Sequence, residues 1–209
     1  VLTGYDSTMA TLCDKVDVIL VGDSAGMVML GYDDTRDVTM DDMIRFTTAV
    51  KNAKTDSLIV ADLPINSYEN EDSAITNSKR LVQAGAHAVK LEGGKEIADI
   101  IKAVVGSGIP VMGHIGFTPQ HKKKFKVEGK SLSQKKKLIK EAHEIQRAGA
   151  FSIVLECVSE KTAEEVTNSL KIPTIGIGSS KKCDGQILVT DDLLGLSGFY
   201  PKFVRRTWC

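Results

Sequence analysis

The stretch VDVILVGDSAGM, residues 16–27, decides the fold of this chain, because an apolar run stops in it at an acid and a hydroxyl. The run Val18–Val21 has no polar face, which is typical of a strand buried on both sides in a parallel sheet covered by helices. Reactive side chains can reach a ligand only where such a buried strand ends, and this end carries Asp23 and Ser24. The stretch therefore predicts a site at the carboxyl end of a strand.

The same pattern of an apolar strand that ends in a polar residue recurs four more times. The later strand ends carry Asp62 after LIVA, Glu92 after AVKL, His114 after VMG, and Glu156 after IVL. All carboxyl ends of parallel strands lie on one face of the sheet, so we expect these side chains to meet Asp23 there. Helical patterns separate the strands at intervals of about 25 to 40 residues, which is typical of βαβ units.

Seven strand and helix units are recognisable, which approaches the eight of a closed (β/α)8 TIM barrel. The segment GFYPKFV, residues 198–204, is the candidate for the eighth strand. An open doubly wound sheet is the competing fold, but no GxGxxG follows the first strand, and the polar strand ends are spread over five strands. We therefore expect residues 1–209 to form a single α/β barrel domain.

Composition limits the partners of this chain. The 27 basic and 27 acidic side chains cancel, so neither nucleic acid nor an anionic membrane surface is expected as a partner. No apolar run reaches the length of a membrane helix, which is about 18 residues or more, and the start VLTGYDSTM does not resemble a signal peptide. The four cysteines form no CxxC pair, which disfavours structural zinc and a disulfide framework. We expect a cytoplasmic protein that acts on small molecules.

Three acids, Asp23, Asp62 and Glu92, end three successive strands of this pattern. Converging carboxylates without histidine or thiolate suit a hard cation that prefers oxygen ligands, so Mg²⁺, with Mn²⁺ as its substitute, is favoured over Zn²⁺. The alternative is that these acids cap helices or pair with nearby lysines. Their occurrence in consecutive units favours the metal site.

Lys90 lies two residues before Glu92, so both side chains point to the same face of their strand, into the barrel interior. Lys90 either forms an internal salt bridge to Asp62 or Glu92, or binds a substrate carboxylate or developing oxyanion, and both can hold. Glu156 follows a strand without lysine and is either a general base or a surface cap residue. His114 is expected to position other groups by hydrogen bonds rather than to transfer the proton.

Taken together, several motifs resemble those of the ketopantoate hydroxymethyltransferase family: VGDSAGM, ADLP, VKLEGG, GHIGFTPQ, VLECV and GIGSSKKCDGQILV. The resemblance runs from Thr3 to Phe203, with the motifs in family order. It implies a barrel of the phosphoenolpyruvate/pyruvate type that binds Mg²⁺ and assembles as a homo-oligomer, a decamer of two pentamers. The implied reaction transfers the one-carbon unit of 5,10-methylenetetrahydrofolate to 3-methyl-2-oxobutanoate, giving 2-dehydropantoate for pantothenate and coenzyme A biosynthesis.

Carried over position by position, the resemblance implies that Asp23 and Asp62 bind the metal and that Glu92 completes its site. Glu156 corresponds to the proton acceptor. The implied contacts to the keto acid are Asp23, Ser24, Asp62 and Lys90. A 2-oxo acid can chelate magnesium through its carboxylate and ketone oxygens, which makes its C3 proton removable.

Two other function classes remain open at this point. A related barrel lyase or mutase would share the metal and the keto acid but would not need folate. A catalytically silent barrel could act as a scaffold, although the intact acids argue against it. Outer helix residues Met40, Met43 and Phe46 are expected to bury apolar surface against neighbouring subunits. The tail RRTWC, residues 205–209, replaces the family's terminal helices, so we expect an incomplete carboxyl end.

Overall fold

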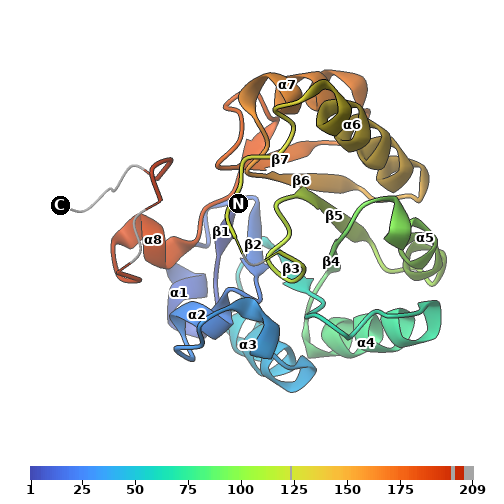
Figure 1. The fold of residues 1–209 in the computed structure, drawn as a ribbon. Coiled ribbons are helices and arrows are strands. Elements are labelled where there is room, and N and C mark those ends of the chain that lie inside the picture. Colours follow the sequence, from blue (N-terminus) through green and yellow to red (C-terminus); the bar gives the residue numbers. More distant parts are fainter. Residues whose placement is uncertain (123, 199–200, 205–209) are drawn as a thin grey trace.

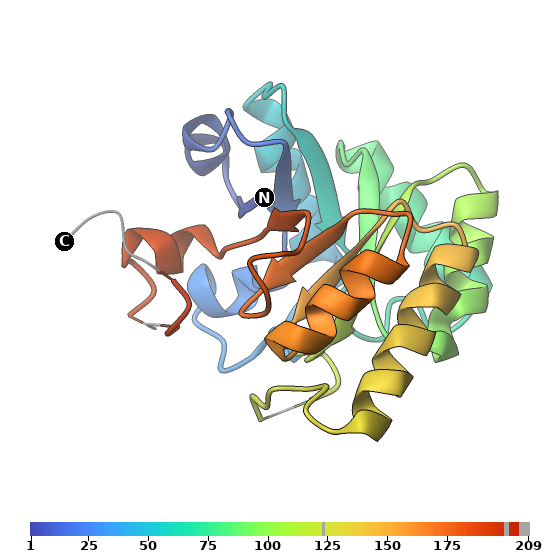
Figure 2. The same ribbon diagram turned by 90° about the horizontal axis from the view of Figure 1, so that it is seen from above.

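The computed structural model describes residues 1–122, 124–198 and 201–204 of the 209-residue chain. Within these residues, eight parallel strands follow one another around one sheet in chain order. A parallel bridge from Leu2 to Leu188 joins the first strand to the chain just after the eighth. The strands thus curl into a barrel with helices around it (Figure 1 and Figure 2), which confirms the predicted fold class.

Strands and helices alternate for most of the chain. The strands are β1 (Leu2–Thr3), β2 (Val18–Val21), β3 (Leu58–Asp62), β4 (Ala88–Glu92), β5 (Val111–Gly116), β6 (Ser152–Glu156), β7 (Thr174–Ile177) and β8 (Gly185–Gln186). The α-helices are α1 (Ser7–Leu12), α2 (Ala25–Val28), α3 (Met40–Asn52), α4 (Glu71–Ala84), α5 (Ala98–Gly106), α6 (Leu132–Arg147), α7 (Glu160–Ser169) and α8 (Thr190–Leu194). Two short 3₁₀ helices are η1 (Thr35–Asp37) and η2 (Lys95–Ile97).

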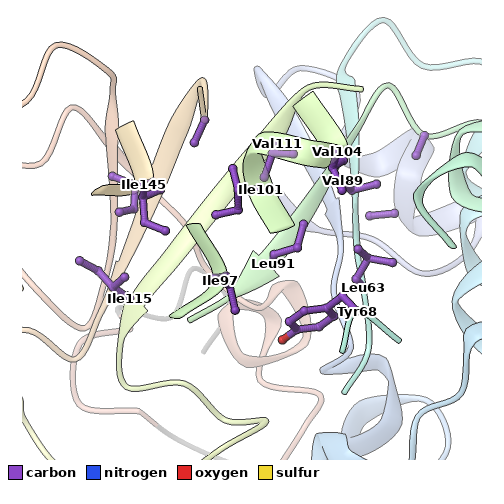
Figure 3. Packing of buried hydrophobic residues seen from close by; sticks show 14 of the residues in the cluster. Leu63, Tyr68, Val89, Leu91, Ile97, Ile101, Val104, Val111, Ile115 and Ile145 are labelled. Atoms are coloured by element: carbon purple, nitrogen blue, oxygen red, sulfur yellow. The ribbon is translucent and has the colours of Figure 1, made fainter. Parts of the chain in front are cut away.

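Two apolar clusters lie on the two faces of the strands, because successive side chains of a strand point to opposite faces. The larger cluster lies between the strands and the outer helices, and Figure 3 shows Leu91 and Val111 of β4 and β5 near Ile101 of α5. The smaller cluster fills the barrel interior. Its buried members are Leu20, Val60, Ala88, Met112, Val154 and Ile187.

Local signals in the sequence account for the helix ends. The Thr39 side chain accepts a hydrogen bond from the backbone N–H of Asp42, and the Asp42 side chain accepts one from the backbone N–H of Thr39, so α3 begins with a capping box. Gly85 ends α4 at φ 117°, a left-handed conformation that favours glycine. Such caps fix the length of each helix and hence where the chain enters the next strand.

The predicted position of the eighth strand was wrong. β8 is Gly185–Gln186, which pairs with Ile175 and Gly176 of β7. Gly198 and residues 201–204 lie in no strand, and residues 199–200 lie outside the described part of the chain. A two-residue strand is too short to produce a hydrophobic run, so the local pattern could not reveal it.

A helix that spans a membrane needs about 20 consecutive, predominantly apolar residues. Not one of the described helices is both long and apolar enough to cross a bilayer.

Candidate active site

A polar layer lies above the inner apolar cluster, at the carboxyl ends of the strands. On each of these strands the inward-facing residue after the cluster member comes two positions later, because side chains alternate. These residues are Gly22, Asp62, Lys90, His114 and Glu156. The structure therefore brings strand ends from β2 to β6 together in one layer, as the sequence predicts.

Most of the predicted site residues are buried despite their charge. Ser24 and Glu156 are half-buried. The fully buried members are Asp23, Asp62, Lys90, Glu92 and His114. Buried charges require partners, so their contacts decide what the site can do.

Lys90 forms internal ion pairs, which is one of the two roles that the sequence predicts for it. Strand register sets Asp62 of β3 opposite Lys90 of β4. The Nζ of Lys90 lies 3.0 Å from Oδ1 of Asp62 and 3.6 Å from Oε1 of Glu92. Burial alone would lower the pKa of Lys90, but the attraction of these carboxylates outweighs it and raises the pKa above its ordinary value.

His114 joins this acid group to the candidate base. Its Nδ1 lies 3.2 Å from Oε1 of Glu92, and its Nε2 lies 3.3 Å from Oε2 of Glu156. Burial by itself would lower the pKa of His114, but the charge of Glu92 and the contact with Glu156 raise it to about 9. The raised pKa favours the protonated imidazole, which suits a positioning role better than proton removal.

The three buried acids of the site differ in how well nearby positive charge compensates their negative charge. Burial would raise the pKa of Glu92, but His114 and Lys90 lower it to about 2. For Asp23, burial and the charges of Asp62 and Glu92 raise the pKa well above its ordinary value. Burial also raises the pKa of Asp62, although Lys90 opposes the shift. The positive charges near Asp23 and Asp62 are therefore not enough to balance the negative charge of these two carboxylates.

The excess negative charge at Asp23 and Asp62 favours the binding of a divalent cation. Among the described residues, no three His, Cys, Asp or Glu side chains are arranged as a group that could hold a metal. Both oxygens of Glu92 already face donors, since Oε2 accepts a hydrogen bond from the backbone N–H of Gln120 at 3.2 Å. Magnesium commonly takes one or two carboxylates and fills its other positions with water and substrate oxygens. Asp23 and Asp62 fit that pattern in charge and chemistry, and Glu92 as a third ligand stays a prediction.

Ser24 is placed beside this group by the turn after β2. Its hydroxyl and the hydroxyl of Tyr5 are hydrogen-bonded at 2.8 Å, and Tyr5 is buried. Gly22 makes room for the turn, because a Cβ there would lie 2.8 Å from Oγ of Ser24 and 3.6 Å from Oδ2 of Asp62. The backbone N–H of Asp23 donates to the same Oδ2 at 3.1 Å.

Glu156 is held at the other side of the layer by the turn after β5. Gly116 lies opposite Glu156 in the register of β5 and β6 and has φ 99°, and a Cβ there would lie 2.3 Å from the carbonyl oxygen of Glu156. The N–H of Phe117 donates to that oxygen at 2.8 Å. Only glycine permits this close approach, which fixes the backbone that carries the candidate base.

Two residues of the site were not identified from the sequence. Gln120 and Tyr68 are buried, and the Tyr68 hydroxyl contacts the side-chain oxygen of Gln120 and the carbonyl oxygen of Glu92. Both residues lie in loops, where no hydrophobic period marks the direction of a side chain. The polar Gln120 shortly after the end of β5, within the motif GFTPQ, was the signal available.

Several known proteins have sequences similar to this chain. A family model described as ketopantoate hydroxymethyltransferase matches residues 1–208. A protein of Nitrosopumilus maritimus (strain SCM1) named 3-methyl-2-oxobutanoate hydroxymethyltransferase is 53% identical, over 99% of this chain and 76% of that protein. A protein of the same name from Clostridium acetobutylicum is 54% identical, over 98% of this chain and 77% of that protein.

Solved structures with a similar fold have lower sequence identity. One is 2,3-dimethylmalate lyase, a PEP mutase/isocitrate lyase superfamily member, with a TM-score of 0.70 and 17% identity over 93% of this chain and 76% of that one. Another is phosphonopyruvate hydrolase in complex with oxalate and Mg²⁺, with a TM-score of 0.68 and 13% identity over 90% of this chain and 74% of that one. These structures share the barrel architecture with this chain.

Proposed function

Because the chain belongs to the ketopantoate hydroxymethyltransferase family and is a transferase, we propose that it moves a hydroxymethyl group from 5,10-methylenetetrahydrofolate to 3-methyl-2-oxobutanoate. The product is 2-dehydropantoate, a precursor for pantothenate and coenzyme A. The observation that carries the proposal is the contact chain from Lys90 through Glu92 and His114 to Glu156. It joins a cation that can hold an acid substrate to a carboxylate that can remove a proton.

The keto acid is proposed to bind where Asp23, Ser24, Asp62 and Lys90 converge. Lys90 offers a compact positive charge for the substrate carboxylate, and the Ser24 hydroxyl, held by Tyr5, offers a hydrogen bond. Mg²⁺, held by Asp23 and Asp62 with Glu92 nearby, would polarise the ketone and acidify the C3 proton.

Glu156 is proposed to take that proton. His114 contacts Oε2 of Glu156 and keeps the carboxylate on the side of the layer that faces the acid group. Loss of the proton leaves the electron pair at C3, which forms the new bond to the one-carbon unit of the folate. The bonds from that carbon to N5 and N10 of the folate break, and water supplies the hydroxyl group of the product. The C3 proton and the second proton of water end on the two nitrogens of the tetrahydrofolate that is released.

Turnover with both proposed substrates tests the reaction. We expect 2-dehydropantoate to form with methylenetetrahydrofolate and Mg²⁺, and not to form when the folate is left out or the metal is chelated. Product from the keto acid without folate would instead favour a lyase or mutase. Absence of turnover with folate and metal present would favour a binding protein.

Lys90 is predicted to act by its charge and not through a Schiff base. The amine is protonated and paired with Asp62 at 3.0 Å, and its raised pKa keeps it from being a nucleophile. Borohydride added with the keto acid should therefore trap no adduct. Mass spectrometry of the digested protein checks this, and a reduced adduct on Lys90 would overturn the assignment.

We propose that the chain assembles as a homo-oligomer built from pentamers. One of the residues expected to face neighbouring subunits needs correction, because Met43 is fully buried in the chain's own core. Met40 and Phe46 are half-buried and pack against that core. Apolar side chains are exposed instead around α2, at Met27, Met29, Leu30 and Tyr32. Light scattering at micromolar concentration should give a mass several times that of the 22.6 kDa chain. A monomer would refute the proposal.

The cytoplasm is the proposed compartment. Cys13, Cys157 and Cys183 are free thiols, which suits a reducing environment.

A further inference from the structure

Gln120 connects four parts of the candidate site, although the contacts proposed for catalysis do not use its side chain. It lies in the loop between β5 and α6 and is buried. Its Nε2 donates to Oδ2 of Asp23 at 2.8 Å and to the carbonyl oxygen of Leu63 at 2.9 Å. Its Oε1 accepts from the hydroxyl of Tyr68, and its backbone N–H donates to Glu92.

These contacts use the hydrogen-bonding groups of the side-chain amide and fix its direction. Nε2 has two N–H groups and faces two acceptors, while Oε1 faces a hydroxyl donor. The reverse orientation would set an amide oxygen against the carboxylate of Asp23 and the carbonyl of Leu63, leaving three buried polar groups without a suitable partner. The carboxylate of Asp23 therefore meets a donor of fixed position.

The consequence for Asp23 is that its two oxygens are no longer equivalent. Oδ2 is occupied by Gln120, whereas no described residue donates a hydrogen bond to Oδ1. Among the residues that the structure describes, no lysine forms an ion pair with Asp23, and Lys90 pairs with Asp62 and Glu92 instead. The bond from Gln120 is thus what sets the orientation of this carboxylate.

We propose that Gln120 is a positioning residue for the metal, which holds Asp23 by Oδ2 and presents Oδ1 as the ligand atom for Mg²⁺. The inference rests on the proposed function, since it assigns Asp23 to the metal. Donors that fix a ligating carboxylate in this way typically contribute about 10- to 100-fold to metal affinity. Gln120 lies three residues beyond Phe117, which holds the backbone of Glu156, so the same short segment also sets the base relative to the metal ligands.

Gln120→Met tests the role of the amide, because it keeps the approximate length of the side chain and removes both donors. The backbone N–H to Glu92 is unaffected, so the change isolates the contacts of the side chain. The measurement is a Mn²⁺ titration of the metal-free protein, followed by the electron paramagnetic resonance of free Mn²⁺, with Mg²⁺ as competitor. We expect affinity for both ions to fall about 10- to 100-fold.

Tyr68→Phe is the matched control. It removes the donor to Oε1 of Gln120 and leaves the two bonds from Nε2 in place, so it perturbs the same buried network without releasing Asp23. We expect a much smaller loss of metal affinity than in Gln120→Met, because both hydrogen bonds from Nε2 remain. Excess Mg²⁺ should also restore most of the turnover of Gln120→Met, which a general packing defect would not allow.

Three results would overturn the inference. The first is wild-type metal affinity in Gln120→Met. The second is a loss of metal affinity in Tyr68→Phe equal to that in Gln120→Met, because a general change of packing would then explain both. If the wild type itself binds neither ion, the metal proposal falls and the role of Gln120 falls with it. If Gln120→Met does not fold by circular dichroism, Gln120→Asn is measured instead. Its amide is one methylene short of Asp23, and it should show the same loss.

Discussion

Glu156→Gln should stop the exchange of the C3 hydrogen of 3-methyl-2-oxobutanoate with solvent while leaving the binding of keto acid and Mg²⁺ largely intact. The substitution keeps the shape of the side chain and removes its basicity. General-base catalysis typically contributes about 10²- to 10⁴-fold, so exchange and turnover should slow by about that factor. Proton NMR of the keto acid in deuterated water, with Mg²⁺ and without folate, measures the effect, because proton removal precedes carbon transfer.

The control for this variant is Glu160→Gln, the same substitution at an exposed position of α7, four residues away. It should exchange the C3 hydrogen at the wild-type rate. If Glu156→Gln also exchanges at the wild-type rate, another group is the base. His114 is then the next residue to test, since its Nε2 lies 3.3 Å from Glu156.

Asp62→Asn should abolish the magnesium-dependent binding of the keto acid, and with it turnover. Asp62 is buried, pairs with Lys90 at 3.0 Å and is one of the two carboxylates left undercompensated. The amide keeps the volume but removes the charge that a divalent cation requires. Calorimetric titration of keto acid with and without Mg²⁺ measures the result, and equally strong metal-independent binding in the wild type would contradict the metal site.

Stability separates this loss from unfolding. Removing one partner of a buried ion pair typically lowers the free energy of unfolding by about 3 to 5 kcal/mol. Asp62→Asn should lower it less, because Glu92 remains 3.6 Å from Lys90. The melting temperature of the metal-free variant should therefore fall while the protein stays folded. Asp41→Asn, at an exposed acid of α3 that pairs with Arg80, is the matched control and should change neither binding nor melting.

Local sequence alone determined the barrel units and the identity of the charged site residues. Short apolar runs such as Val18–Val21 are typical of buried strands, and helix signals such as Thr39 and Gly85 act within a few residues of the chain. Since all parallel strands end on one face, the acids and the histidine at those ends had to meet. The alternation of side chains also correctly placed Lys90 and Glu92 on one face.

Tertiary structure decided the closure of the barrel and the contacts within the site. β8 is formed by pairing with Ile175 and Gly176 and has no pattern of its own. The placement of His114 between Glu92 and Glu156 follows from the register of three strands. Register depends on packing over the whole barrel, and no local pattern encodes it.

Gln120 shows the same limit in a loop. Its contacts with Asp23 and Leu63 join residues 97 and 57 positions apart in the chain. A loop side chain has no period that predicts its direction, so only the folded backbone determines what it reaches. The sequence therefore specified which groups carry the chemistry, whereas the tertiary structure decided how they are oriented, because orientation depends on long-range hydrogen bonds and burial.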